Sequence, residues 1–249
     1  MINLNHGSDY QPGRAAPAQA PIGEQINAAI DYGLAKRRAT EPKRTYLGAS
    51  RLGDPCARKL VYEYRGYDGT PPPGLLLRVF AAGHAFEALT IEWLRLAGFD
   101  VRDRDRHDKQ FRFHQVSGRI AGGIDGVIIS GPVTLPYPVL FENKAIKAST
   151  WNRLVKYGLA ATSEVYEGQV QLYLGYLKLQ HALFCAMNKD TQELYWQLIP
   201  LDLALCQHLS DRAVDILRAA EADELPPRIA AARDHYLCRM CDFAKRCWE

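Results

Sequence analysis

Three residues in the middle of the chain have the side chains that metal-assisted hydrolysis needs. They are Asp125 in the segment GGIDGV, and Glu142 and Lys144 in the segment FENKA. Carboxylate oxygens are hard ligands, and Mg²⁺ or Mn²⁺ is usually held by one or two of them while water or a substrate phosphate fills the other positions. A nearby lysine adds a compact positive charge. The pattern predicts metal-assisted hydrolysis of phosphodiester bonds.

Both segments lie in runs that are typical of β-strands. In YPVLFENKAI apolar residues precede the charges, and on a strand Glu142 and Lys144 share one face while Asn143 points to the other. The run GRIAGGIDGVIIS is predicted to be a second strand, with its paired glycines at a bulge or a close backbone approach and Asp125 near its middle. Neighbouring strands would then bring the three side chains to one point. The competing interpretation of Glu142 and Lys144 is a solvated pair at a sheet edge.

A helix predicted from about Leu75 to Leu96 carries two polar residues in an otherwise apolar stripe. His84 and Glu87 share helical spacing with Phe80 and Ile91. A buried polar group without a partner costs about 1–3 kcal/mol, so the pair needs a partner. A metal ion or its bound water would meet that need, and so would a hydrogen bond between the two side chains or to the backbone.

A second helix, predicted from about Ser163 to Leu179, has an amide and aromatic face that includes Gln169 and Tyr173. Such a face suits contacts to a nucleotide or to Lys144. The alternative is a half-exposed helix whose tyrosine rings pack while their hydroxyls stay in water.

Four of the six cysteines have the grouping of a metal site. Cys238, Cys241 and Cys247 stand close together near the C-terminus, and Cys56 in the segment LGDPCARKL is a fourth candidate. Clustered thiolates fit Zn²⁺ or an iron–sulfur cluster, and the spacing alone does not separate the two. A disulfide is the competing explanation, although no secretory signal peptide opens the chain. The remaining two cysteines are predicted to be buried small apolar residues: Cys185 and Cys206.

Five motifs in this order resemble the PD-(D/E)XK nucleases of the RecB type. They are Gly83-His84-x-x-Glu87, Gly123-Ile124-Asp125-Gly126, Glu142-Asn143-Lys144, Gln169-x3-Tyr173 and the four clustered cysteines. Within that group the chain resembles the iron–sulfur branch, which includes the CRISPR-associated Cas-four exonucleases and their phage-encoded relatives. The resemblance extends from about Ser50 to Cys247.

The resemblance implies a role for each motif. His84, Asp125 and Glu142 would be ligands of Mg²⁺ or Mn²⁺, and Lys144 would orient or activate the attacking water. Glu87 would lie behind the ligands. Gln169 and Tyr173 would match residues that bind DNA and position the active site, and Cys56, Cys238, Cys241 and Cys247 would hold a structural 4Fe-4S cluster, with Zn²⁺ as the alternative. The chain departs from the family at Asn143, where an apolar residue is more usual.

Composition and element order predict the architecture. With 249 residues, of which 47% are hydrophobic and 24% charged, the chain can form one sizeable core. We expect a disordered tail over residues 1–21 and a single RecB-like nuclease domain over residues 22–249. Further helices are predicted over about 22–38, 56–64 and 202–221, and strands in QFRFHQV, HALFCAMNK and ELYWQLIPL. The fold class is therefore α/β, a mixed central sheet flanked by helices, and the resemblance makes it a restriction-endonuclease-like core. A C-terminal cysteine lobe would be tied to an N-terminal helical segment.

Charge and hydropathy limit the partners. The net charge of +3 is mild, so a nucleic-acid surface would have to come from local basic groups. Candidates for a phosphate track are Arg58, Lys59, Lys147, Arg153, Lys156, Lys245 and Arg246. No apolar run approaches the roughly 20 residues of a membrane span, and we expect a cytoplasmic protein of a bacterium or a phage-infected cell.

The sequence thus predicts a metal-dependent DNA nuclease. The resemblance favours an exonuclease that acts on single strands or DNA ends in recombination, repair or CRISPR adaptation, with proteins of those processes as partners. One alternative is an inactive DNA-binding or interaction module with structural zinc, and another is a restriction-type endonuclease. Cleavage polarity, the choice between DNA and RNA, and the oligomeric state stay open.

Overall fold

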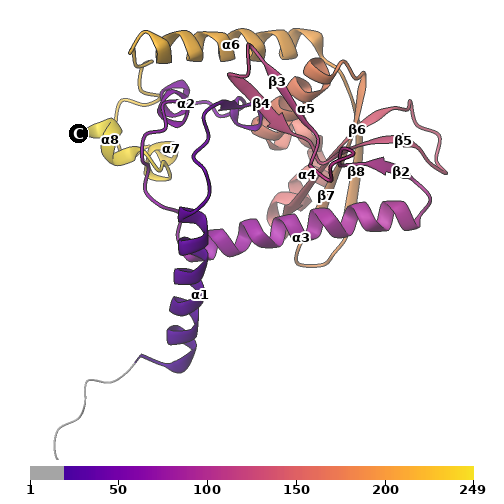
Figure 1. The fold of residues 1–249 in the computed structure, drawn as a ribbon, viewed down its shortest axis with the longest axis horizontal. Helices are drawn as coiled ribbons and strands as arrows, with labels where there is room; N and C mark the ends of the chain where they lie inside the picture. Colours follow the sequence, from indigo (N-terminus) through magenta and orange to yellow (C-terminus); the bar gives the residue numbers. More distant parts are fainter. Residues whose placement is uncertain (1–19) are drawn as a thin grey trace, which may run out of the picture.

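The structure is a computed structural model that describes residues 20–249. The predicted disordered tail therefore lies outside the described residues, except for its last two positions. Within residues 20–249 eight strands form two sheets, and helices cover both faces of the larger one (Figure 1). The α-helices are α1 (Ile22–Ala39), α2 (Ala57–Tyr64), α3 (Gly74–Leu96), α4 (Ala148–Thr162), α5 (Glu164–Leu177), α6 (Leu203–Glu221), α7 (Tyr236–Arg239) and α8 (Ala244–Trp248).

The central sheet has five strands in the order β2-β5-β6-β7-β8. The pair β6 and β7 is parallel, and the other neighbours are antiparallel, so the sheet is mixed as predicted. Its strands are β2 (Asp100–Arg102), β5 (Gly126–Ser130), β6 (Val139–Ile146), β7 (His181–Asn188) and β8 (Leu194–Pro200).

A second, three-stranded sheet corrects the prediction of one strand through residues 118–130. Its order is β1-β4-β3, with β1 (Leu47–Gly48), β3 (Arg112–Gln115) and β4 (Ile120–Gly123). The chain leaves this sheet after Gly123 and enters the central sheet at Gly126, so the two glycines end a strand and form no bulge within it. Gly122 is instead a point of close packing, because a Cβ there would lie 2.7 Å from the Phe113 ring. Asp125 consequently stands in the connection between the sheets, and not in the middle of a strand.

Strand alternation explains how the central sheet is buried on both faces. On β6, Leu140 belongs to the core cluster that also contains Leu172 of α5, whereas Phe141 belongs to the cluster that contains Ile91 and Leu94 of α3. Because successive side chains point to opposite faces, α5 covers the face that carries Glu142 and Lys144. Helix α6 runs along the opposite side of the molecule from α3 (Figure 1).

Helix α3 corrects the expectation that the chain holds no segment of membrane-spanning character. This helix of 23 residues is long and apolar enough to cross a membrane by length and composition alone. A core helix of an α/β protein passes the same test. Ile91 and Leu94 do pack against the sheet, and the helix also carries charges at Glu87, Glu92 and Arg95.

The two ends of the described chain have different surroundings. Helix α1 extends away from the body, has no buried residue and contacts α3 (Figure 1). The short helices α7 and α8 lie beside α2, where the rings of Tyr62 and Phe243 are 5.5 Å apart. This contact ties the C-terminal lobe to the N-terminal helical segment, as predicted.

Candidate active site

Asp125, Glu142 and Lys144 meet where β5 and β6 begin their pairing. Gly126 stands opposite Phe141 in the antiparallel pair, so the next position in this register places Asp125 opposite Glu142. The backbone N–H of Asn143 donates a hydrogen bond of 2.8 Å to Asp125 Oδ2. Lys144 Nζ donates to Glu142 Oε1. The structure therefore brings together the three residues that the sequence predicted to converge.

The Glu142 carboxylate is buried and incompletely satisfied. Its side chain is 1% exposed, and its Oε1 accepts hydrogen bonds from Lys144 Nζ and, at 2.6 Å, from Gln169 Nε2. Its Oε2 has no hydrogen-bond partner among the described residues. A buried acceptor without a partner costs about 1–3 kcal/mol, and a cation is a partner that suits a carboxylate.

Burial and mutual repulsion shift the pKa values of these groups. Burial raises the pKa of Glu142 to about 8, and the negative charge of Asp125 adds to this while Lys144 opposes it. Burial likewise raises the pKa of Asp125, again against the effect of Lys144. Burial lowers the pKa of Lys144, but the two carboxylates outweigh it and leave the pKa raised. Among the described residues, Asp125 and Glu142 thus have only one lysine, Lys144, to balance two negative charges in a poorly solvated environment. The binding of an additional cation would balance the second charge.

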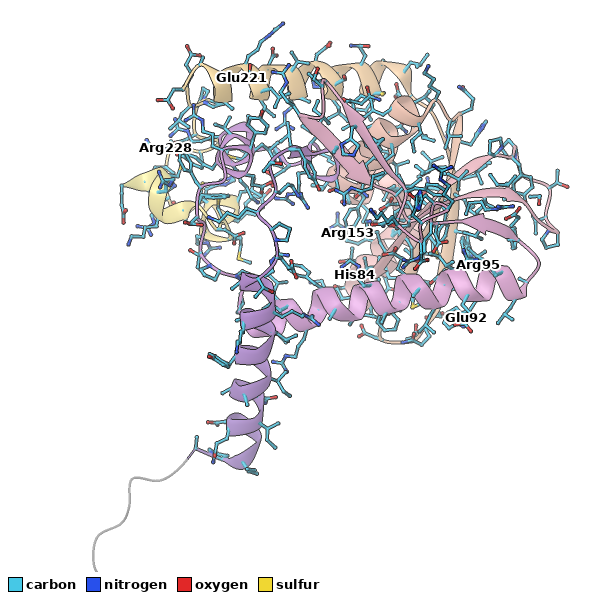
Figure 2. The ribbon with its side chains drawn as sticks, viewed as in Figure 1. His84, Glu92, Arg95, Arg153, Glu221 and Arg228 are labelled. Carbon is cyan, nitrogen blue, oxygen red and sulfur yellow. The ribbon has the colours of Figure 1, made fainter. Side chains whose placement is uncertain are left out.

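His84 and Glu87 lie at the rim of this group. The His84 side chain is 84% exposed, and its Nδ1 is 3.7 Å from Glu87 Oε2. It projects from α3 on the side that faces the rest of the molecule (Figure 2). Burial raises the pKa of Glu87 to about 7, and the charge of Asp125 adds to the shift. The Asp125 charge therefore reaches Glu87, whereas the exposed His84 ring does not close over the site.

Two carboxylates, Asp125 and Glu142, form the donor set that the structure offers a divalent ion. Within residues 20–249 no three His, Cys, Asp or Glu side chains are placed as a ready metal-binding cluster. Mg²⁺ commonly keeps several waters and takes one or two protein carboxylates, so the pair fits such an ion. The unpartnered Glu142 Oε2 is the observation that favours the fit.

Helix α5 supports the site from one side. Gln169 contacts Glu142 directly, but the Tyr173 ring is buried in the core, edge-on to Phe113 with 5.1 Å between ring centroids. Burial, followed by the charge of Glu142, raises the pKa of Tyr173. Tyr166 is a neighbour that sequence reasoning did not assign to the site: Lys144 Nζ lies 5.5 Å from its ring centroid. Tyr166 shares a face of the predicted helix with Gln169 and Tyr173, and this spacing could have assigned it to the site.

All four cysteines predicted to form a cluster line one cavity of about 50 Å³ between α2 and the C-terminal lobe. That volume exceeds the roughly 10–15 Å³ that a cavity needs to hold one water molecule. Burial raises the pKa of Cys56 and of Cys241. Cys185 and Cys206 are buried elsewhere, as predicted. The cavity is lined by Asp54, Cys56, Lys59, Arg228, Ile229, Leu237, Cys238, Cys241, Ala244, Cys247 and Trp248.

Comparisons with known proteins place the fold. No protein-family model matches the sequence, and no curated protein matches it. The observed fold is mixed α/β, with a mixed sheet flanked by helices as predicted, and it is consistent with a restriction-endonuclease-like core.

A particular protein with this fold is the alkaline exonuclease LHK-Exo from Laribacter hongkongensis. One structure of it matches with a TM-score of 0.52 and 16% identity, over 80% of this chain and 93% of that chain. The structure of LHK-Exo in complex with dAMP gives a TM-score of 0.53 and 17% identity, over 72% and 89% of the two chains. At this identity the likeness shows the shared fold.

Proposed function

We propose that this protein is a metal-dependent nuclease that hydrolyses phosphodiester bonds of DNA, acting on single strands or on ends. The observation that carries the proposal is the unpartnered Oε2 of the buried Glu142, held beside Asp125 and Lys144. The shared fold with an alkaline exonuclease supports it. By resemblance, the iron–sulfur branch of RecB-type nucleases is the proposed subgroup, with recombination, repair or CRISPR adaptation as the setting.

Asp125 and Glu142 would hold Mg²⁺ or Mn²⁺, with the exposed His84 as a proposed third ligand. Such an ion supplies Lewis acidity toward the scissile phosphate and lowers the pKa of a bound water. Lys144 places its ammonium next to Glu142, where it would stabilise charge that develops on the phosphate oxygens. Gln169 fixes the Glu142 side chain, and the Asn143 N–H fixes Asp125.

The test is digestion of end-labelled single strands and duplexes with and without Mg²⁺ or Mn²⁺. We expect metal-dependent release of short products by the wild type, and none by Asp125→Asn or Glu142→Gln. Glu92→Gln on the exposed side of α3 is the matched control and should cleave like the wild type (Figure 2). A protein that binds DNA without cutting it would instead be an inactive module. Cleavage of circular DNA would show an endonuclease.

We also propose that the four cysteines hold a structural 4Fe-4S cluster, with zinc as the alternative. The support is that Cys56 and three cysteines from the far end of the sequence line one cavity, with Lys59 and Arg228 beside them to balance thiolate charge. Purification without air, followed by iron, sulfide and zinc analysis, tests this. A brown protein with equal iron and labile sulfide supports the cluster, a colourless zinc protein supports the alternative, and a metal-free protein refutes both.

A further inference from the structure

Two arginines share one tyrosine ring on the small sheet. The Arg44 Cζ lies 5.3 Å and the Arg112 Cζ 5.6 Å from the centroid of the Tyr46 ring. Arg112 also donates a hydrogen bond to the Tyr46 hydroxyl. Among residues 20–249 neither guanidinium has a carboxylate partner. Two positive charges therefore lie beside one ring, and no carboxylate among the described residues occupies their N–H donors.

The backbone around this group gives Arg44 its place. Gly48 has no side chain on the side where Arg44 folds back: a Cβ added at Gly48 would come within 2.5 Å of Arg44 Nη1. Both arginines are exposed, whereas Tyr46 is half-buried and anchored directly before the buried strand β1. The half-buried ring thus contacts two exposed arginine side chains.

The position of this group connects it with the acidic site. Arg112 stands opposite Gly123 in the β3–β4 pair, and the adjacent Phe111 carbonyl accepts the Ile124 N–H. Asp125 follows two residues after Gly123, about 7 Å of extended chain. A polyanion that approaches Asp125 and Glu142 meets repulsion, and two guanidiniums on the adjoining small sheet would offset it.

We propose that Arg44 and Arg112, held by Tyr46, form a clamp for a phosphate of the nucleic-acid strand that enters the site. This inference rests on the proposed nuclease function and names how its substrate is held. The planar guanidinium presents paired N–H donors that match phosphate oxygens, and two of them on one support bind a phosphodiester without reading its base. The occupant is a strand backbone, bound in a salt-dependent and sequence-independent way.

The experiment measures binding separately from cleavage. Fluorescence anisotropy of a labelled oligothymidylate is recorded in EDTA over a range of salt concentrations, with the double variant Arg44→Gln/Arg112→Gln. We expect binding to weaken roughly tenfold or more, and the log–log salt slope to fall by about 0.7, since one phosphate contact on a single strand contributes about 0.7. The matched control is Arg37→Gln/Arg218→Gln, which removes the same charge from α1 and α6 and should bind within about twofold of the wild type.

Two further variants test the geometry without changing the charge. Gly48→Ala displaces the Arg44 guanidinium, and Tyr46→Phe removes the hydroxyl that accepts the hydrogen bond from Arg112. Each should weaken binding by a few-fold while circular dichroism shows an intact fold. Binding by the double variant that equals the control, with an unchanged slope, overturns the clamp. Tighter binding of labelled poly-glutamate than of the oligonucleotide would overturn its assignment to nucleic acid.

The two proposals fail in different ways. A wild type that binds the strand through this group but never cuts it with Mg²⁺ or Mn²⁺ refutes the nuclease and leaves the clamp. A wild type that cuts, together with a double variant that binds and cuts like the control, refutes the clamp and leaves the nuclease.

Discussion

Replacing Glu142 by glutamine should make the metal-free protein more stable at neutral pH. Burial raises the pKa of Glu142 from 4.5 to about 8. The unfolded chain therefore releases this proton first as the pH rises, and the folded state loses stability from about pH 4.5 up to about pH 8. At 1.36 kcal/mol per unit, the loss amounts to about 3 kcal/mol at pH 7. A neutral glutamine resembles the protonated acid, accepts from Lys144 and Gln169, and carries no such loss.

The assay is urea unfolding in EDTA at pH 4.5 and pH 7, followed by tryptophan fluorescence. We expect the Glu142→Gln variant to match the wild type near pH 4.5 and to exceed it by about 3 kcal/mol at pH 7. Addition of Mg²⁺ should remove most of this difference in stability, because an ion that binds the folded wild type stabilises it by about 2.7 kcal/mol at one hundred times its dissociation constant. The Glu142→Gln variant lacks one carboxylate ligand, so Mg²⁺ should add little to its free energy of unfolding.

Two results would refute this reasoning. A difference in unfolding free energy that does not change with pH would show that ionisation of Glu142 is not its source. A wild type that is the more stable protein at pH 7 without metal would show that the Lys144 ion pair outweighs the cost of burial. Glu92→Gln, at an exposed position on α3, is the control and should stay within about 0.5 kcal/mol at either pH.

Three other changes have expected outcomes. Lys144→Ala should keep strand binding but lower the rate of cleavage of end-labelled DNA by about a hundredfold or more, and near-normal cleavage would exclude Lys144 from the reaction. Gly122→Ala should lower the unfolding free energy by about 1–3 kcal/mol in a thermal melt, because a Cβ there would lie 2.7 Å from the Phe113 ring. Gly83→Ala is its control, with nothing within 4 Å of an added Cβ, and should be neutral or stabilising. Cys56→Ala should reduce the bound metal and the melting temperature together; full metal content would remove Cys56 from the ligand set.

Local patterns were sufficient for much of the fold. The helices over 22–38 and 202–221 and the strand through FENKA were predicted close to their observed bounds. Helix α4 was not predicted: its start has no side-chain cap, and Gly158 inside it has a φ of 76° that breaks the helical path. Strands β1 and β2 were missed because two or three residues are too few to show a period.

The sequence by itself determined which side chains are available for chemistry and which of them share a face. Alternation along one strand puts Glu142 and Lys144 together, and the spacing of the last three cysteines follows from the chain alone. Tertiary structure decided which of them meet. Strand register decided that the chain changes sheets at Ile124 and Asp125. Contacts between distant segments decided that Tyr173 is buried and that Arg44 and Arg112 both lie beside Tyr46. Periodicity reports the local path of a chain, whereas such contacts depend on how whole elements pack around a shared core.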